Sequence, residues 1–141
     1  MLAGTTQTDG VLTFTVPPPM TAPTPALGVT GAAYTNNDLA TSTATTLFDI
    51  DTTADRVVIQ SPANNGFLVA TGNLGVDADV VAGFDIYSVL ADGTTVLNRA
   101  FASLIVGGTA GFYEIDLLTG QAILVRNFND SVIDIAIPLD Q

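Results

Sequence analysis

Short segments in which apolar and polar residues alternate follow one another along most of this chain. In residues 11–16, Leu12, Phe14 and Val16 fall on one side and two threonines fall on the other, which is the two-residue period of a half-buried strand. Helix-favouring residues are scarce, because the chain has a single Glu and no Lys. From Gly28 onward, further strand-like segments are separated by clusters of Asn, Asp, Gly and Thr, at 29–35, 45–51, 56–60, 67–71, 80–89, 96–106, 112–117, 122–128 and 132–139. An all-β fold is therefore predicted.

A proline-rich segment separates the first strand-like segment from the rest. Five of the seven prolines lie in residues 17–25, and proline there favours an extended, stiff backbone. The pattern predicts three parts: an N-terminal strand arm at 1–16, a connector at 17–28 and a β-repeat domain at 29–141.

An internal repeat points to the architecture of that domain. Residues 47–59 align without gaps on residues 112–124, and each copy is expected to form a strand, a tight turn and a second strand. Gly120 in the second turn can adopt a positive φ. A fainter similarity relates residues 29–34 to 81–86, at a different spacing. Repeats of this size are typical of propeller blades, so we expect a short antiparallel array of two to three blades.

Several short motifs occur in a fixed order along the chain. They are Ala-Ala-Tyr-Thr-Asn-Asn at 32–37, Thr-Leu-Phe-Asp-Ile-Asp at 46–51, Gln-Ser-Pro-Ala-Asn-Asn-Gly at 60–66, Leu-Gly-Val-Asp at 74–77 and Val-Ala-Gly-Phe-Asp-Ile at 81–86. From about Val29 to Ile137, the chain resembles a bacterial family of unknown function with propeller-like repeats. The resemblance implies a secreted, repeat-built β protein without an established activity. The chain resembles the C-terminal part of that array, and its segment 87–99 is longer than the family pattern.

Composition excludes several classes of function. With 14 acidic and 3 basic residues the net charge is −11, so nucleic acid is not expected as a partner and anionic membrane surfaces should repel the chain. No apolar stretch is long enough for membrane insertion. The chain has no His and no Cys, which removes the usual zinc sites and the Ser-His and Cys-His catalytic arrangements. No cofactor is expected.

Two pairs of carboxylates are the remaining candidates for catalysis. Asp49 and Asp51 form one pair, and Glu114 and Asp116 form the other. Alternation places both members of a pair on one face of a strand, and glycosidases use such pairs. We expect these faces to be exposed to solvent and to keep apolar strands soluble, so no catalytic residue is assigned and no enzyme is predicted.

Calcium and sugars are the candidate ligands. The loops 75–79 and 36–38 contain the Asp and Asn oxygens that calcium prefers, but neither has a known calcium-loop spacing, and ordinary turn residues are the favoured interpretation. A sugar site would need an exposed aromatic platform. The chain has no Trp, and alternation places Tyr113 in the core.

Open strand edges lead to the functional hypothesis. Two to three blades cannot close a ring, so their edges should pair with other copies. The residues expected to do so lie in the first and last strands, and they are Leu12, Phe14, Val16, Ile133, Ile135 and Ile137. The predicted function is a non-enzymatic self-assembling structural subunit, an extracellular oligomer or fibre whose partner is itself. A monomeric sandwich and a secreted propeller-type module that binds glycan or calcium are the alternatives. An extracellular or cell-surface location is expected, although residues 1–6 do not resemble a secretory signal.

Overall fold

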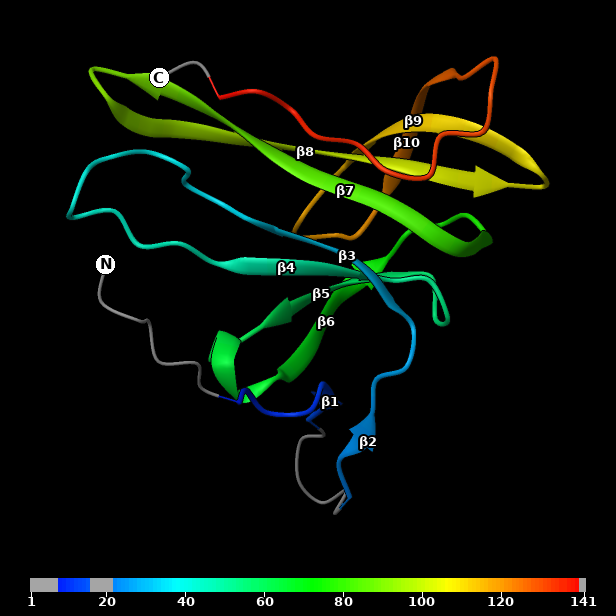
Figure 1. Cartoon of the computed structure of the whole chain (residues 1–141), viewed down its shortest axis with the longest axis horizontal. Coiled ribbons are helices and arrows are strands. Elements are labelled where there is room, and N and C mark those ends of the chain that lie inside the picture. Colours follow the sequence, from blue (N-terminus) through cyan, green and yellow to red (C-terminus); the bar gives the residue numbers. More distant parts are fainter. Residues whose placement is uncertain (1–7, 16–21, 140–141) are drawn as a thin grey trace, which may run out of the picture.

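The computed structural model describes residues 8–15 and 22–139, which form two β-sheets (Figure 1). The six-stranded first sheet has the order β2-β1-β6-β5-β4-β3, and the four-stranded second sheet has the order β10-β9-β8-β7. The strands are β1 (Thr13–Phe14), β2 (Thr24–Pro25), β3 (Val29–Tyr34), β4 (Leu47–Asp51), β5 (Arg56–Gln60), β6 (Phe67–Asn73), β7 (Ala78–Ala91), β8 (Thr94–Val106), β9 (Thr109–Ile115) and β10 (Ala122–Asn127), with a 3₁₀ turn at Ala63–Asn65. Neighbouring strands are antiparallel, apart from the parallel pair of β1 and β6. The all-β prediction is confirmed.

The repeated sequence forms one hairpin in each sheet. Strands β4 and β5 pair from Leu47–Gln60 to Asp51–Arg56, and β9 and β10 pair from Ile115–Ala122 outward. The predicted strand, turn and strand are thus present in both copies. The two sheets are open, and the propeller-like blades are not confirmed.

One apolar core lies between the two sheets. Phe48 and Ile50 of β4 point into it from the first sheet, and the equivalent Tyr113 and Ile115 of β9 point into it from the second. All four side chains are buried, so the predicted placement of Tyr113 in the core is confirmed. The alternation of the repeat therefore places the apolar residues of both hairpins in one shared interior.

The first sheet also rolls around its other face. Strands β2 and β3 are at opposite ends of this sheet, which in a flat sheet would separate them by about 24 Å, at about 4.8 Å per strand. However, Pro25 ends β2 and Val29 begins β3, and a connection of that length spans at most about 14 Å. The sheet must therefore curl, and this gives it a second interior, which contains the fully buried Val58 and Leu68.

Polar contacts join the two sheets where β3 lies along β7. The loop after β3 donates two backbone N–H groups to the second sheet: Asn36 N to Asn98 Oδ1, at 2.9 Å, and Asn37 N to Ser88 Oγ, also at 2.9 Å. Ser88 and Asn98 are themselves hydrogen-bonded at 2.9 Å. These contacts close one side of the sandwich and fix the position of β8 relative to β4.

The C-terminal segment crosses the outer side of the second sheet without forming a strand (Figure 1). Ile137 N donates to Asp85 Oδ2 of β7 at 2.6 Å, and the backbone of Asp134 lies so close to Gly83 that a Cβ there would overlap it. The prediction of a final strand at 132–139 is wrong. The outer face of β7 is covered by irregular chain, which Gly83 allows to approach.

The N-terminal strand is part of the first sheet of the same chain. Thr13 and Phe14 pair with β6 on one side and with β2 on the other, while Val16 lies outside the described residues. No helix of the described residues is long and apolar enough to cross a membrane.

Candidate functional site

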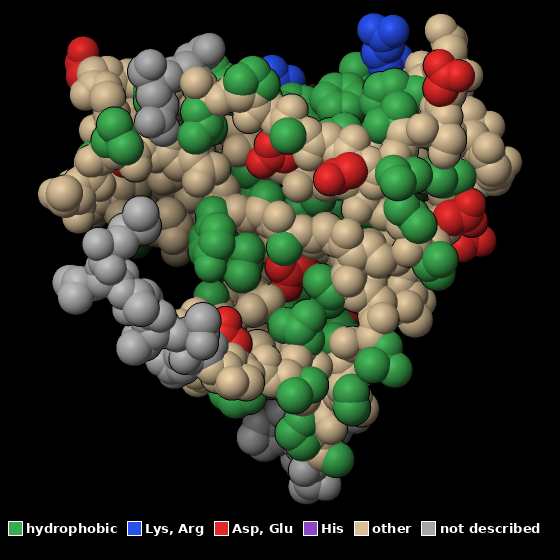
Figure 2. Space-filling view, in the orientation of Figure 1, with side chains coloured by type: hydrophobic (Ala, Val, Ile, Leu, Met, Phe, Trp, Pro, Cys, Tyr) green, Lys and Arg blue, Asp and Glu red, His purple; other side chains and the backbone are tan. Residues whose placement is uncertain are grey.

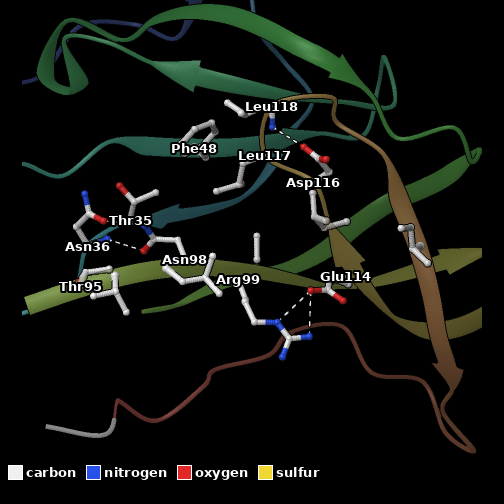
Figure 3. Close-up of a pocket in the computed structure, with 15 residues that line it drawn as sticks. Thr35, Asn36, Phe48, Thr95, Asn98, Arg99, Glu114, Asp116, Leu117 and Leu118 are labelled. Carbon is white, nitrogen blue, oxygen red and sulfur yellow. Dashed lines mark hydrogen bonds and ion pairs between the residues drawn. The ribbon is translucent and has the colours of Figure 1, made fainter. Parts of the chain in front are cut away.

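A cleft of about 660 Å³ lies where β9 ends and β8 continues (Figure 3). The first residue of β8 that pairs with β9 is Ala100, opposite Ile115. The preceding part of β8, from Thr94 to Arg99, is paired with β7 on its other side. Because β9 stops short, this part of β8 forms one wall of the cleft, and the turn between β9 and β10 forms another.

Exposed aliphatic side chains surround this cleft. Val96 and Leu97 of β8, Leu118 of the turn and Ile123 of β10 line it, and all four are more than half exposed. Phe48 of the first sheet also lines the cleft but is buried. The cleft therefore presents apolar surface that the single chain leaves in contact with water.

The polar groups of the cleft are largely occupied by one another. Asn98 Nδ2 donates to Asn36 Oδ1 at 2.7 Å, and Thr95 donates through both N and Oγ1 to Asp38 Oδ2, at 2.9 and 2.7 Å. These two donors lower the pKa of Asp38 because they stabilise the carboxylate form. With its amides and hydroxyls engaged in this way, the lining favours apolar contact over the many hydrogen bonds that a sugar requires.

An ion pair stands at the edge of the cleft. Arg99 places Nη2 at 3.0 Å and Nε at 3.1 Å from Glu114 Oε1, and both side chains are close to half exposed. An exposed pair of this kind contributes about 0–1 kcal/mol to stability. Its main consequence is local charge balance in a strongly acidic protein.

The turn between β9 and β10 brings two leucines to the cleft. Asp116 Oδ1 accepts hydrogen bonds from Leu118 N at 2.9 Å and from Thr119 N at 3.0 Å. These bonds to the charged form lower the pKa of Asp116. They also fix the backbone of the turn without any contribution from the exposed side chain of Leu118. Leu117 is partly buried against the core, whereas Leu118 is 77% exposed.

The same turn is held against the first sheet. Ala122 N donates to Leu74 O at 2.9 Å. The backbone of Thr119 approaches Gly72 of β6 so closely that a Cβ on Gly72 would overlap it. Leu118 is therefore presented from an anchored turn.

Strand β10 continues this apolar surface along an edge of the second sheet. Ile123, Leu124 and Val125 are each about half exposed, and β10 has a strand neighbour on one side, β9, among the described residues. A bulge between Leu124 and Arg126 leaves Val125 without a register partner on β9. The edge is apolar and carries one positive charge.

The residues that line the cleft and those of β10 carry two charges of each sign. Arg99 and Arg126 lie here with Glu114 and Asp116, although the chain as a whole carries −11. On the face drawn in Figure 2, basic side chains appear along the upper edge, over the second sheet. The remaining arginine, Arg56, pairs with Asp51 at 3.0 Å.

The carboxylate pairs have different environments. Glu114 is partly exposed and Asp116 is exposed, as expected from the sequence. The expectation that Asp49 and Asp51 face solvent is wrong, because the roll of the first sheet encloses them and leaves them 0% and 2% exposed. Asp51 accepts from Arg56, and the Arg56 guanidinium lies 3.9 Å from the centre of the Phe14 ring.

Among the described residues, Asp49 has neither an ion-pair partner nor a hydrogen-bond partner. Both carboxylate oxygens are buried without a partner, and burial raises the pKa of Asp49 to about 6. Alternation along β4 places it beside Val58 of β5, on the face away from the shared core. It does not line the cleft, so the structure does not bring the two carboxylate pairs together.

The two candidate calcium loops differ in their contacts. Asn36 and Asp38 use side-chain oxygens to bind Asn98 and Thr95, and Asp77 and Asp79 are exposed. No group of three or more acidic residues in the described part of the chain is placed to hold a metal ion.

The residues predicted to associate lie on two different sheets. Leu12 and Phe14 are partly buried with the first sheet, whereas Ile135 and Ile137 are partly buried on the segment that crosses β7, with Ile133 exposed beside them. Sequence reasoning missed the aliphatic turn and the β10 edge. The internal repeat contains a sequence signal for the aliphatic turn: it aligns Thr52 and Thr53 with Leu117 and Leu118, so polar residues in one copy are replaced by leucines in the other.

Comparison with known proteins identifies a family but no activity. Residues 1–136 match the family described as Domain of unknown function (DUF4394). No curated protein and no solved structure matches the chain.

Proposed function

We propose that this chain, which belongs to the DUF4394 family, is a non-enzymatic subunit that associates with a second copy through the open edge of β10. The observation that carries the proposal is the row of three half-exposed aliphatic residues, Ile123 to Val125, on a six-residue edge strand. An exposed apolar edge offers main-chain hydrogen bonds and apolar area to another strand.

The other edge strands are less suited to pairing. Strand β2 has two residues, and β3 and β7 lie along each other within the molecule. Among the strands of the described residues, β10 therefore combines useful length with an open side. The N-terminal arm becomes a weaker candidate for exchange, because Thr13 and Phe14 already pair within their own chain.

Association through the same edge on both copies favours a closed pair over a fibre. Two copies that meet through the same edge are related by a two-fold axis, and this arrangement uses up the edge of each. The bulge at Leu124 and the charge of Arg126 are features that limit indiscriminate edge pairing. We therefore propose a two-fold dimer as the main product.

The acidity of the chain does not prevent this association. Copies with a charge of −11 repel one another at a distance, but salt screens that repulsion beyond about 8 Å at physiological ionic strength. Arg126, the one charged residue of β10, lowers the negative charge of each copy at the contact itself. Burial of aliphatic surface then adds about 25 cal/mol per Å².

A charge placed on the edge tests the proposal. We expect Val125→Lys to abolish dimer formation in sedimentation velocity runs from about 1 μM to about 1 mM, because a desolvated charge would face the partner strand. Val125 has no register partner on β9, so the substitution leaves the strand pairing within the monomer intact. Leu27→Lys is the matched control, since Leu27 is 93% exposed in the connection between β2 and β3 and the change in net charge is the same. Equal dimerisation of both variants would contradict the role of β10.

The binding-module alternative has less support. The amides and hydroxyls of the cleft are engaged with neighbouring side chains, which leaves few for a glycan, and Asn36 and Asp38 of the first calcium candidate loop bind Asn98 and Thr95. An extracellular location and a relation to propeller blades remain proposals. Detection of the chain in the culture medium or on intact cells tests the location.

A further inference from the structure

We infer that a proton on Asp49 keeps the roll of the first sheet closed, and that loss of this proton releases β1 and β2 from β6. The device is independent of the proposed association through β10, which lies in the other sheet. It covers the edge of β6 at low pH and exposes that edge at high pH, because β1 is the strand that pairs with β6 on this side.

Asp49 is a carboxylate without a counter-charge in the interior of the roll. The charged residues in the strands of the first sheet are Asp49, Asp51 and Arg56. Arg56 Nε lies 3.0 Å from Asp51 Oδ2 and balances that carboxylate, whereas both oxygens of Asp49 are buried without a partner among the described residues. Alternation puts Asp49 on the same face as Asp51, opposite Val58 of β5. A carboxyl group in such surroundings is more stable with its proton than without it.

The strands on either side of Asp49 bring no counter-charge to it. Its register partner on β3 is Ala32, and on its other side the pairing continues through β5 to Ala70 of β6. Tyr34, further along the same face of β3, is exposed. Asp55, in the turn between β4 and β5, directs its carboxylate to a backbone N–H of the second sheet. The proton on Asp49 itself is therefore what keeps this interior neutral.

Two N-terminal elements close the roll over the face that carries Asp49. The ring of Phe14 in β1 lies over the Arg56 guanidinium, 3.9 Å from it. The connection after β2 lies against Asp51, since a Cβ on Gly28 would overlap Asp51 Oδ1. Strands β1 and β2 have two residues each and lie at the end of the first sheet away from the second sheet (Figure 1). The roll can thus open here while the core between the sheets stays intact.

The direction of the switch follows from the protonation of Asp49. Its pKa is about 6 in the closed roll, against an ordinary value of 3.8 that applies once water reaches the carboxylate. The closed state therefore binds the proton more tightly than the open state does, and rising pH favours opening. Between pH 4 and pH 8 the equilibrium constant for opening should increase by about fiftyfold.

Hydrogen exchange measures this opening. The backbone N–H groups of Thr13 and Thr15 donate to Gly66 O at 2.8 Å and to Leu68 O at 3.1 Å, so they exchange when β1 leaves β6. We expect the protection factor of the peptide covering residues 8–15 to fall by about fiftyfold from pH 4 to pH 8, measured by mass spectrometry at low protein concentration. Residues 100–104 of β8, which pair with both β7 and β9, report global unfolding and should be better protected at every pH.

Two variants separate Asp49 from the other carboxylates. Asp49→Asn removes the titrating group, and protection of residues 8–15 should then no longer depend on pH. Asp79→Asn is the matched control, because it removes the same charge from an exposed position on β7, and its pH dependence should equal that of the unmodified chain. Asp49→Leu, which places no polar group in the roll, is a second variant that should also show no pH dependence.

The possible outcomes decide between this device and its alternatives. If the protection of residues 8–15 does not change with pH in the unmodified chain, or changes equally in Asp49→Asn and Asp49→Leu, the proton on Asp49 does not control the roll. If residues 8–15 and 100–104 are equally protected at every pH, β1 leaves only when the whole chain unfolds, and the local release is wrong. None of these results bears on the β10 dimer, which is tested by its mass.

Discussion

Replacing Asp49 should reveal how much a buried charge costs this fold. Its carboxylate is 0% exposed and has no hydrogen-bond partner, and its pKa in the folded chain is about 6 against an ordinary value of 3.8. A difference of about two pKa units corresponds to about 3 kcal/mol between the two protonation states. We expect Asp49→Leu, which puts two methyl groups where the oxygens lie, to raise the free energy of unfolding by about that amount at pH 7.

The pH dependence gives this prediction its sign. Because the pKa is higher in the folded chain than in the unfolded chain, the folded state holds the proton between pH 3.8 and about 6, and stability falls as pH rises through that interval. The advantage of Asp49→Leu should therefore be small at pH 4, grow up to about pH 7 and then level off.

Urea unfolding followed by far-UV circular dichroism, at low protein concentration and at several pH values between 4 and 8, measures this difference. Asp38 and Asp116, whose pKa values are lowered, have the opposite pH dependence but are present in both proteins, so their contribution cancels. Asp49→Asn is a second variant that removes the charge while keeping the shape. If the gain from Asp49→Leu is the same at pH 4 and pH 7, the carboxylate is not carrying a buried charge and the reasoning is wrong.

Three further predictions concern the loops and the surface. Asp38→Asn should lower stability at pH 7, because Asp38 accepts two bonds from Thr95; since its pKa is lowered, this loss should shrink as pH falls, and equal losses in thermal melts at pH 7 and pH 3 would contradict it. Gly72→Ala should destabilise the chain by about 1–3 kcal/mol because its Cβ would overlap the backbone of Thr119, and an unchanged Tm would show that the turn is not packed there. Added NaCl should strengthen association by screening the repulsion between chains of −11; dissociation by salt, seen by light scattering, would mean that ion pairs hold the copies together.

The local pattern of the chain was sufficient to predict most strands. Alternation identified β4 and β5 and their repeat in β9 and β10 because a two-residue period directly reports which side chains face the core. It failed at 132–139, where the same alternation occurs in irregular chain. There Ile135 and Ile137 are partly buried while Ile133 is exposed, and Gly83 allows the backbone to approach β7 without a ladder of hydrogen bonds.

The environment of Asp49 could not be predicted from its strand. Glu114, its equivalent in the repeat, is partly exposed and paired with Arg99, whereas Asp49 is enclosed. The difference arises from the short connection between Pro25 and Val29, which forces the first sheet to roll. The burial of Asp49 thus depends on a short connection that is distant from it in the sequence. The alternation within a single strand carries no information about such a connection.

The aliphatic turn beside the cleft also could not be predicted from strand periodicity. Leu117 and Leu118 occur in a turn, where apolar residues give no periodic signal. Leu118 is exposed beside the part of β8 that pairs with β7 but not with β9. The contrast with Thr52 and Thr53 in the aligned repeat was the one feature of the sequence that marked them.

The mass of the chain in solution tests the central claim most directly. Sedimentation velocity over a range of concentrations should show a species of 14.5 kDa that converts, as concentration rises, into one of twice that mass and no larger. A single 14.5 kDa species at every concentration would contradict self-association, and growth into particles without an upper limit would contradict the closed two-fold pair.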